Sequence, residues 1–136
     1  MKKHARMKPN DTAVFIIRIG LGIFFLLFSI SKFTQPLNWA GYIPDFISGL
    51  LAGIALKQIV FVMLLGLVEA VLGVLLVFGV YTKIIAGIAV ALILPIMISQ
   101  IPNEIAIRDF GLFCMAIALL FAETSSLFSC ARLKRT

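Results

Sequence analysis

Residues 59–80 are apolar except for a single charge, Glu69, and this stretch constrains the fold more than any other. Sixteen of its 22 residues are Leu, Ile, Val or Phe. On a membrane-insertion scale they contribute roughly −5 to −10 kcal/mol, against about +3 kcal/mol for a central acid. At about 1.5 Å per residue, a helix of this length spans roughly 33 Å, the thickness of a bilayer core. The stretch therefore predicts a membrane-spanning helix whose buried carboxylate needs a partner or a proton.

Composition and charge place the rest of the chain in the same environment. The sequence is 62% hydrophobic and only 13% charged, against about 25% charged in soluble domains. The net charge of +6 is concentrated in two basic tails, residues 1–13 and 122–136, that flank the apolar region. Basic flanks beside membrane spans indicate cytoplasmic ends. This distribution, without any base-reading motif, argues against a nucleic-acid partner.

Three more apolar segments complete an all-α, integral membrane four-helix bundle, which forms a single transmembrane domain over residues 1–136. We predict spans at 14–33, 59–80, 84–101 and 105–121. Four crossings return the chain to its starting side, in agreement with two basic tails. A cleaved signal peptide is the competing interpretation of the first segment, but Arg18 interrupts its apolar region and three spans follow.

Two connections carry further information. Residues 46–54 have helical periodicity but are too short to span, which predicts an interfacial or re-entrant helix between spans one and two. The very short loop 81–83 predicts an antiparallel hairpin of spans two and three.

Small residues indicate which helix faces point inward. In span one, Arg18, Phe25 and Lys32 share a stripe with Gly22 and Ser29. In span two, two glycines lie on the face of Glu69, and span three carries a small-xxx-small pair at Gly87 and Ala91. Small residues let membrane helices approach closely, so the predicted packing glycines are Gly22, Gly66, Gly73 and Gly87.

The charged residues form two expected groups. Arg18 and Glu69 both point inward, about six residues or roughly 9 Å apart along the axis, so we expect them to meet. Near the outer surface, Glu104 and Arg108 have the spacing of an i, i+4 pair, and Asp109 faces Lys32. The candidate residues of an intramembrane polar site are Arg18, Lys32, Glu69, Arg108 and Asp109. They are either salt bridges that pair the helices or a pocket in which Glu69 binds a ligand or relays a proton.

Missing motifs limit the chemistry. His4, in the basic leader, is the single histidine, and the two cysteines form no metal-binding or C-x-x-C pattern. We therefore expect no metal site, no bis-histidine haem in the bundle and, without a phosphate-binding loop, no ATP-driven work. A redox role would require a diffusible lipophilic carrier such as quinone, or a partner protein.

Several motifs in order resemble the DoxX-like family of small membrane proteins. The first span resembles the family's first helix in Arg18-Ile-Gly-Leu-Gly22, Phe25, Leu26 and Lys32-Phe33. Glu69-xxx-Gly73, followed by Gly79-xx-Thr82-Lys83, is similar to its second helix and basic turn, and Arg108-Asp109 to the start of its last helix. The resemblance covers residues 17–120 and departs at Ser29, where many relatives have glycine.

This resemblance implies a four-helix bundle in the inner membrane. Some relatives are subunits of quinone-linked oxidoreductases, notably for thiosulfate, and most have no established activity. The leading hypothesis is a quinone- or lipophile-binding subunit of a membrane redox complex, at most one subunit of an enzyme, with a redox protein as its partner. The alternatives are a small proton-coupled transporter and a non-catalytic scaffold. Homo-oligomer formation is left open.

Overall fold

The protein is described by a computed structural model that gives the backbone of residues 9–133 and the side chains of residues 12–122. Every regular element in this range is a helix: α1 (Pro9–Thr34), α2 (Pro36–Ala40), α3 (Asp45–Gly53), α4 (Gln58–Phe78), α5 (Thr82–Ser99) and α6 (Glu104–Leu133). Four of them, α1, α4, α5 and α6, are long and apolar enough to cross a membrane. The predicted all-α fold with four spans is therefore confirmed.

The helix ends differ from the predicted ones where local chemistry decides them. α4 ends at Phe78 because Gly79 adopts a left-handed conformation (φ 73°) and its amide bonds back to the carbonyl of Leu76. α6 continues to Leu133 instead of ending at 121, since residues 122–133 contain no glycine or proline. The outermost parts of the predicted tails, 1–8 and 134–136, lie outside the described residues.

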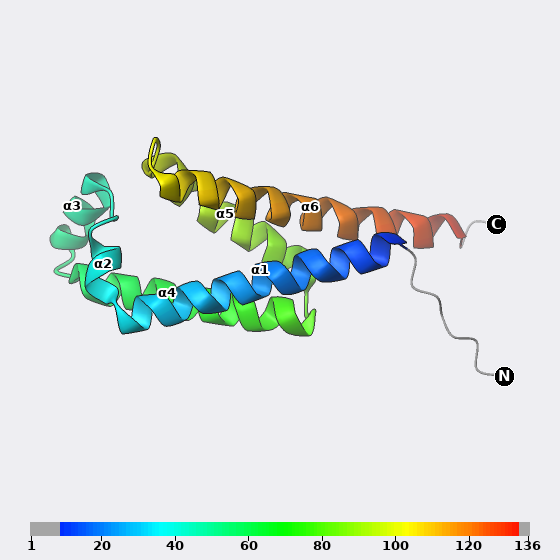
Figure 1. Ribbon diagram of the computed structural model, residues 1–136, viewed down its shortest axis with the longest axis horizontal. Coiled ribbons are helices and arrows are strands. Elements are labelled where there is room, and N and C mark those ends of the chain that lie inside the picture. The colour runs from blue at the N-terminus through cyan, green and yellow to red at the C-terminus, as the bar shows by residue number, and fades with distance from the viewer. Residues whose placement is uncertain (1–8, 134–136) are drawn as a thin grey trace.

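The four long helices are arranged as two pairs (Figure 1). α1 packs along α4, and α5 packs along α6. The start of α1 and the end of α6 lie at one end of the bundle, whereas α2 and α3 lie at the other. The turn between α4 and α5 is short, as expected, but the two helices diverge from it instead of forming a closely packed hairpin.

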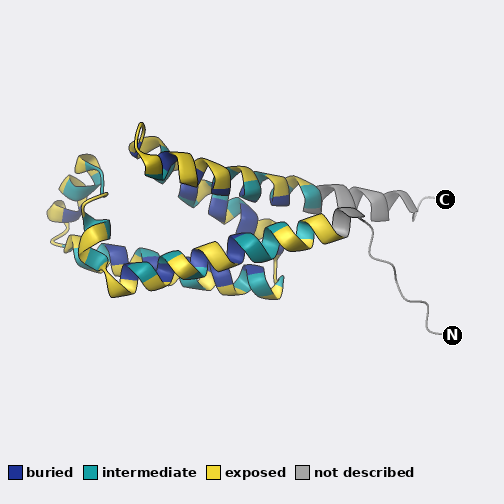
Figure 2. Ribbon diagram, viewed as in Figure 1, coloured by how far each residue is buried: buried dark blue, intermediate teal, exposed yellow. Residues whose placement is uncertain are grey.

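Glycine permits the close approach of α1 and α4. A Cβ atom on Gly73 would lie 2.8 Å from the carbonyl oxygen of Gly22, and one on Gly22 would lie 3.0 Å from the carbonyl oxygen of Gly73. A side chain at either position would thus collide with backbone. Buried residues line the facing sides of the helices, while exposed ones cover the outside (Figure 2). In a bilayer, packing of this kind replaces the hydrophobic effect as the source of helix association.

In α5, the packing face is not the predicted one. The buried positions are Thr82, Ile85, Ala86, Ala89 and Ile93, whereas Ala91 is exposed. Gly87 is half-buried, and a Cβ on it would lie 4.0 Å from Leu120, so its lack of a side chain is not required there. The alanines on the buried face are already small enough for α5 to pack on Leu112, Ala116 and Leu119 of α6.

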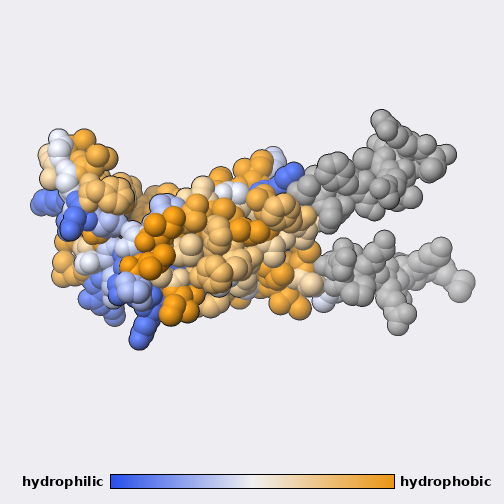
Figure 3. All heavy atoms as spheres, turned by 90° about the horizontal axis from the view of Figure 1, so that it is seen from above, coloured by the Kyte–Doolittle hydropathy of each residue, from blue (hydrophilic) through white to orange (hydrophobic). Residues whose placement is uncertain are grey.

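The outer surface suits a lipid environment. Large apolar side chains are exposed on all four long helices, among them Ile16, Leu67, Phe78, Ile84 and Ile107. Hydrophilic residues gather toward the α2–α3 end in the view of Figure 3, next to a broad apolar surface. The short helix predicted at residues 46–54, between spans one and two, is confirmed as α3, and a second short helix, α2, precedes it. A lipid bilayer is therefore the environment that these spans require.

Candidate functional site

A buried ion pair joins the two helices of the first pair. The Lys32 ammonium donates a hydrogen bond of 2.6 Å to Oε2 of Glu69, and both side chains are about 5% exposed or less. Lys32 lies in the last turn of α1, and Glu69 lies near the middle of α4. Gly66 makes the contact possible because its missing side chain leaves room for Lys32, whose Cβ would be 3.1 Å from a Cβ there.

A second ion pair, formed within α6, lies near the Lys32–Glu69 pair. Nε and Nη2 of Arg108 both contact Oδ1 of Asp109 at 3.1 Å. Adjacent residues of a helix point about 100° apart, so the arginine side chain must bend back to reach its neighbour. The Asp109 side chain is 9% exposed but that of Arg108 is 39% exposed, so this pair is half-open whereas the Lys32–Glu69 pair is closed.

Two aromatic rings connect the pairs. The Lys32 ammonium lies 4.1 Å from the centre of the Trp39 ring, and the Arg108 guanidinium lies 4.5 Å from the centre of the Phe28 ring. Trp39 is held by a hydrogen bond from its indole nitrogen to the Ser31 hydroxyl. Cation–π contacts stabilise a charge by about 0.5–1 kcal/mol at exposed sites and by about 2 kcal/mol where the charge is desolvated, as it is for Lys32. The two cations are therefore stabilised by rings as well as by carboxylates.

All four charged residues line one cavity of about 290 Å³ between the two helix pairs at the α2–α3 end. Its walls are mostly apolar, with Phe25 from α1, Leu65 from α4 and Pro95 from α5 among them. Tyr42, in the turn before α3, borders it, and the Tyr42 carbonyl accepts a hydrogen bond from the Gln100 side chain. The result is an apolar chamber with a compact polar cluster and zero formal net charge.

The structure corrects the expected pairing of Arg18 with Glu69. Arg18 lies level with Gly79, at the end of α4, and Glu69 lies ten residues earlier in the chain, a distance of roughly 15 Å along the axis. The sequence-based estimate aligned the inner ends of the spans, whereas the Gly22–Gly73 contact sets a different register. Lys32, on the same stripe as Arg18, is the residue that reaches Glu69.

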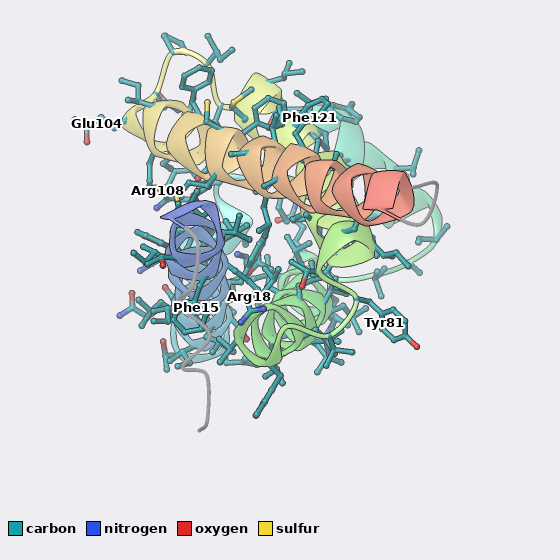
Figure 4. The ribbon with its side chains drawn as sticks, turned by 90° about the vertical axis from the view of Figure 1, so that its right-hand side faces the viewer. Phe15, Arg18, Tyr81, Glu104, Arg108 and Phe121 are labelled. Carbon is teal, nitrogen blue, oxygen red and sulfur yellow. The ribbon has the colours of Figure 1, made fainter. Side chains whose placement is uncertain are left out.

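Arg18 instead lies at the opposite end of the bundle, between the ends of α1 and α4 (Figure 4). Its guanidinium packs against Gly79 and lies 5.4 Å from the Phe15 ring. Among the described residues its Nε is the one fully buried side-chain nitrogen or oxygen that lacks a hydrogen bond. A cation at the carboxyl end of α4 is favoured by the helix dipole, so the position of Arg18 is consistent with a role in helix pairing.

This contact gives a prediction for Gly79→Ala. We expect a loss of about 1–2 kcal/mol in the free energy of unfolding, because a left-handed alanine is strained and its Cβ would collide with Arg18. Denaturation in mixed micelles containing increasing SDS measures the loss. Gly41→Ala is the matched control, since Gly41 has a φ of −66° and its nearest neighbour would be 3.7 Å from the new Cβ. Equal midpoints for the two variants would contradict the prediction.

The other predicted charge pairs do not form as expected. Glu104 was expected to pair with Arg108, but Arg108 binds Asp109, and Glu104 points away from the bundle (Figure 4). Asp109 was expected to face Lys32; it lies in the same cluster, within electrostatic range of Glu69. Trp39 and Phe28 were missed as site residues. The sequence signal was their spacing from Lys32: Phe28 lies four residues before it on the same helix, and Trp39 lies seven residues after it in the connection that follows.

Within the described residues, His, Cys, Asp and Glu side chains form no group of three or more that would hold a metal ion. The chemistry available is that of two carboxylates, two cations, a phenol and an apolar chamber. Such a set of groups is suited to a molecule with a polar head group and an apolar remainder.

Four membrane-spanning helices around an internal ion cluster define a small polytopic protein of the helical-bundle class. The sequence model of the DoxX family matches residues 13–100, and the chain belongs to this family. The matched range contains Lys32, Trp39 and Glu69 and ends before Arg108 and Asp109. Comparisons with curated proteins and with solved structures gave no match.

Proposed function

We propose that this protein binds a lipophilic molecule of the quinone type in the cavity between its helix pairs, as a membrane subunit of a redox complex. The observation that carries the proposal is the position of the Lys32–Glu69 and Arg108–Asp109 pairs inside a chamber with apolar walls. An ion pair that only joined helices would not require such a chamber beside it.

The cavity has the size and lining of a ligand site. Its volume of about 290 Å³ is near the lower end of the range of ligand pockets, about 300–1,000 Å³. This volume holds a substituted ring but not a long isoprenoid chain, which would extend into lipid. Phe25, Phe28 and Leu65 supply apolar contact for the ring, and the ion cluster supplies orientation.

The polar residues fit such a head group. Lys32 and Arg108 carry N–H donors suited to a carbonyl oxygen, and Glu69 and Asp109 carry acceptors suited to a hydroxyl group. When bound, a quinone supplies the electron- and proton-carrying chemistry that these side chains lack. The chain's own contribution is to bind the ring, exclude bulk water and hold both signs of charge next to it.

Transport through the bundle is less well supported. Between Arg18 at one end and Glu69 lies a layer of apolar side chains that are 4% exposed or less: Leu21, Phe25, Leu72 and Leu76. This layer separates the two charged regions, so the polar groups form a chamber at one end instead of a path between the two ends. A chamber confined to one end of the bundle favours binding over proton-coupled transport.

We further propose that the protein resides in the inner (plasma) membrane with both termini in the cytoplasm. The support is the positive charge of both tails, together with an even number of spans. The cavity, at the opposite end from these tails, is then near the outer leaflet.

Trp39, the single tryptophan, provides a direct test because it borders the cavity. We expect a short-chain benzoquinone to quench Trp39 fluorescence saturably in nanodiscs, since bound quinone would lie near the indole. The measurement is a fluorescence titration at two or more lipid-to-protein ratios. A fixed number of quinones bound per protein, independent of the lipid present, is the expected result.

The control moves the reporter to the lipid-facing surface. In Trp39→Phe combined with Leu67→Trp, the indole occupies a position that is 54% exposed on the outside of α4. Quenching there should rise with the quinone concentration in the lipid and should not saturate. If both proteins show the same unsaturable quenching, and if the hydroquinone of the same ring also fails to bind, the proposed function is wrong.

A further inference from the structure

The two carboxylates of the cluster are not fully used. Glu69 accepts its hydrogen bond through Oε2, and Asp109 accepts both of its contacts through Oδ1. Neither Oε1 of Glu69 nor Oδ2 of Asp109 accepts a hydrogen bond from the described residues. Each carboxylate therefore has one oxygen available for another donor.

These two oxygens are accessible from the cavity. Among the described side-chain nitrogen and oxygen atoms, Arg18 Nε is the one that is both fully buried and unbonded, so the two free oxygens retain accessible surface. Glu69 and Asp109 are only 3% and 6% exposed, and both line the cavity. The accessible part of each carboxylate must then face the chamber.

The donors of the cluster are also engaged only in part. The Lys32 ammonium donates to Glu69 and lies over the Trp39 ring, and Arg108 directs Nε and Nη2 to Asp109. A guanidinium has five N–H groups, so three of Arg108 remain, two on Nη1 and one on Nη2, and Lys32 keeps two N–H groups that bond no oxygen of the described residues. A head group that enters the chamber thus meets two carboxylate acceptors beside these donors, and an accepting carbonyl can bond the donors but not the carboxylates.

We propose that the cavity selects the reduced, hydroxyl-bearing form of its ligand, a hydroquinone-type phenol that donates hydrogen bonds to Glu69 Oε1 and Asp109 Oδ2. This inference rests on the proposed function and specifies which form of the ligand the site holds. A phenolic hydroxyl is both donor and acceptor, so it satisfies a carboxylate while it accepts from Arg108 or Lys32. A carbonyl would place lone pairs against the carboxylate oxygens. Hydrogen bonds to charged acceptors are the stronger class.

The test compares three ligands with the same ring: trimethyl-1,4-benzoquinone, its hydroquinone and the dimethyl ether of that hydroquinone. Binding to the wild-type protein in nanodiscs is measured by isothermal titration calorimetry without oxygen. We expect the hydroquinone to bind about tenfold or more tightly than the other two, the ratio that one charge-assisted hydrogen bond gives. The ether matters because it keeps the shape of the ring but cannot donate.

Two variants test whether Glu69 and Asp109 cause the preference for the hydroquinone. Glu69→Gln and Asp109→Asn each replace a carboxylate by an amide of the same shape, and each should reduce the ratio of hydroquinone to quinone affinity severalfold. Glu104→Gln is the matched control, since this exposed acid lies outside the cluster and should leave the ratio unchanged. The ligand series on the wild type decides the question even if a variant does not fold.

The outcomes separate the two proposals. Equal affinity for the three ligands, or tighter binding of the quinone, would overturn the selection while leaving the proposed function intact. Binding of none of the three would overturn both. Unchanged ratios in well-folded Glu69→Gln and Asp109→Asn would show that these oxygens do not make the selection.

Discussion

Replacement of Lys32 by methionine should lower the free energy of unfolding by about 3–5 kcal/mol, the usual loss when one member of a buried ion pair is removed. The variant leaves the Glu69 carboxylate in the middle of a membrane helix without the cation that donates to it. Glu69→Leu should have a smaller effect. Lys32 lies in the last turn of α1, and its long side chain can extend toward the membrane surface.

The double variant Lys32→Met/Glu69→Leu should be more stable than Lys32→Met, because neither charge is then left unpaired. The measurement is a double-mutant cycle from SDS titrations in mixed micelles, followed by Trp39 fluorescence. Glu104→Gln serves as the control and should change stability by about 0.5 kcal/mol or less, as surface substitutions usually do. Additive losses in the cycle would refute the coupling of Lys32 and Glu69.

Gly73→Ala should separate α1 from α4 and cost about 1–3 kcal/mol, the usual penalty of overpacking. The new Cβ would lie 2.8 Å from both the Gly22 carbonyl oxygen and Cγ of Leu26, so the backbone itself must move. The same denaturation experiment measures the loss. Because the register of α1 on α4 brings Lys32 to Glu69, the variant should also weaken ligand binding in the cavity.

Two other glycines make this a graded series. Gly66→Ala should cost less than Gly73→Ala, because its Cβ would lie 3.1 Å from a side-chain carbon, Cβ of Lys32, instead of a backbone atom. Gly111→Ala has no atom within 4 Å of its new Cβ and should be neutral or stabilising by about 0.5–1 kcal/mol, through its helix propensity alone. A loss of stability in Gly111→Ala equal to that in Gly73→Ala would contradict the packing argument.

The spans and their inward faces follow from the sequence because hydrophobicity and helical periodicity are local properties. Gly66, Glu69 and Gly73 share a face in the sequence pattern, and all three are buried on α4. The stripe of Gly22, Phe25, Ser29 and Lys32 is likewise buried on α1. These features depend on about 100° per residue and on nothing beyond the helix itself.

The partner of Glu69 could not be derived in the same way. Which residue of α1 meets it depends on how far the helices slide past one another, and the long connection through α2 and α3 leaves that offset free. The side-by-side contact of Gly22 and Gly73 sets it, and only the structure places the two at one level. The role of Trp39 also depended on tertiary structure, since α2 must fold back over α1 before the indole reaches Lys32.

The three-residue turn between α4 and α5 has a mechanical consequence. It joins the two helix pairs at one end, while the cavity lies at the other end (Figure 1). With α4 about 32 Å long, the helix pairs act as lever arms, and each degree of rotation at Gly79–Tyr81 moves the far end by about 0.5 Å. The hydrogen bond between Gln100 and the Tyr42 carbonyl lies at that far end. Because it joins the end of α5 to the α2–α3 connection far from the turn, this hydrogen bond opposes separation of the two pairs with a long lever arm.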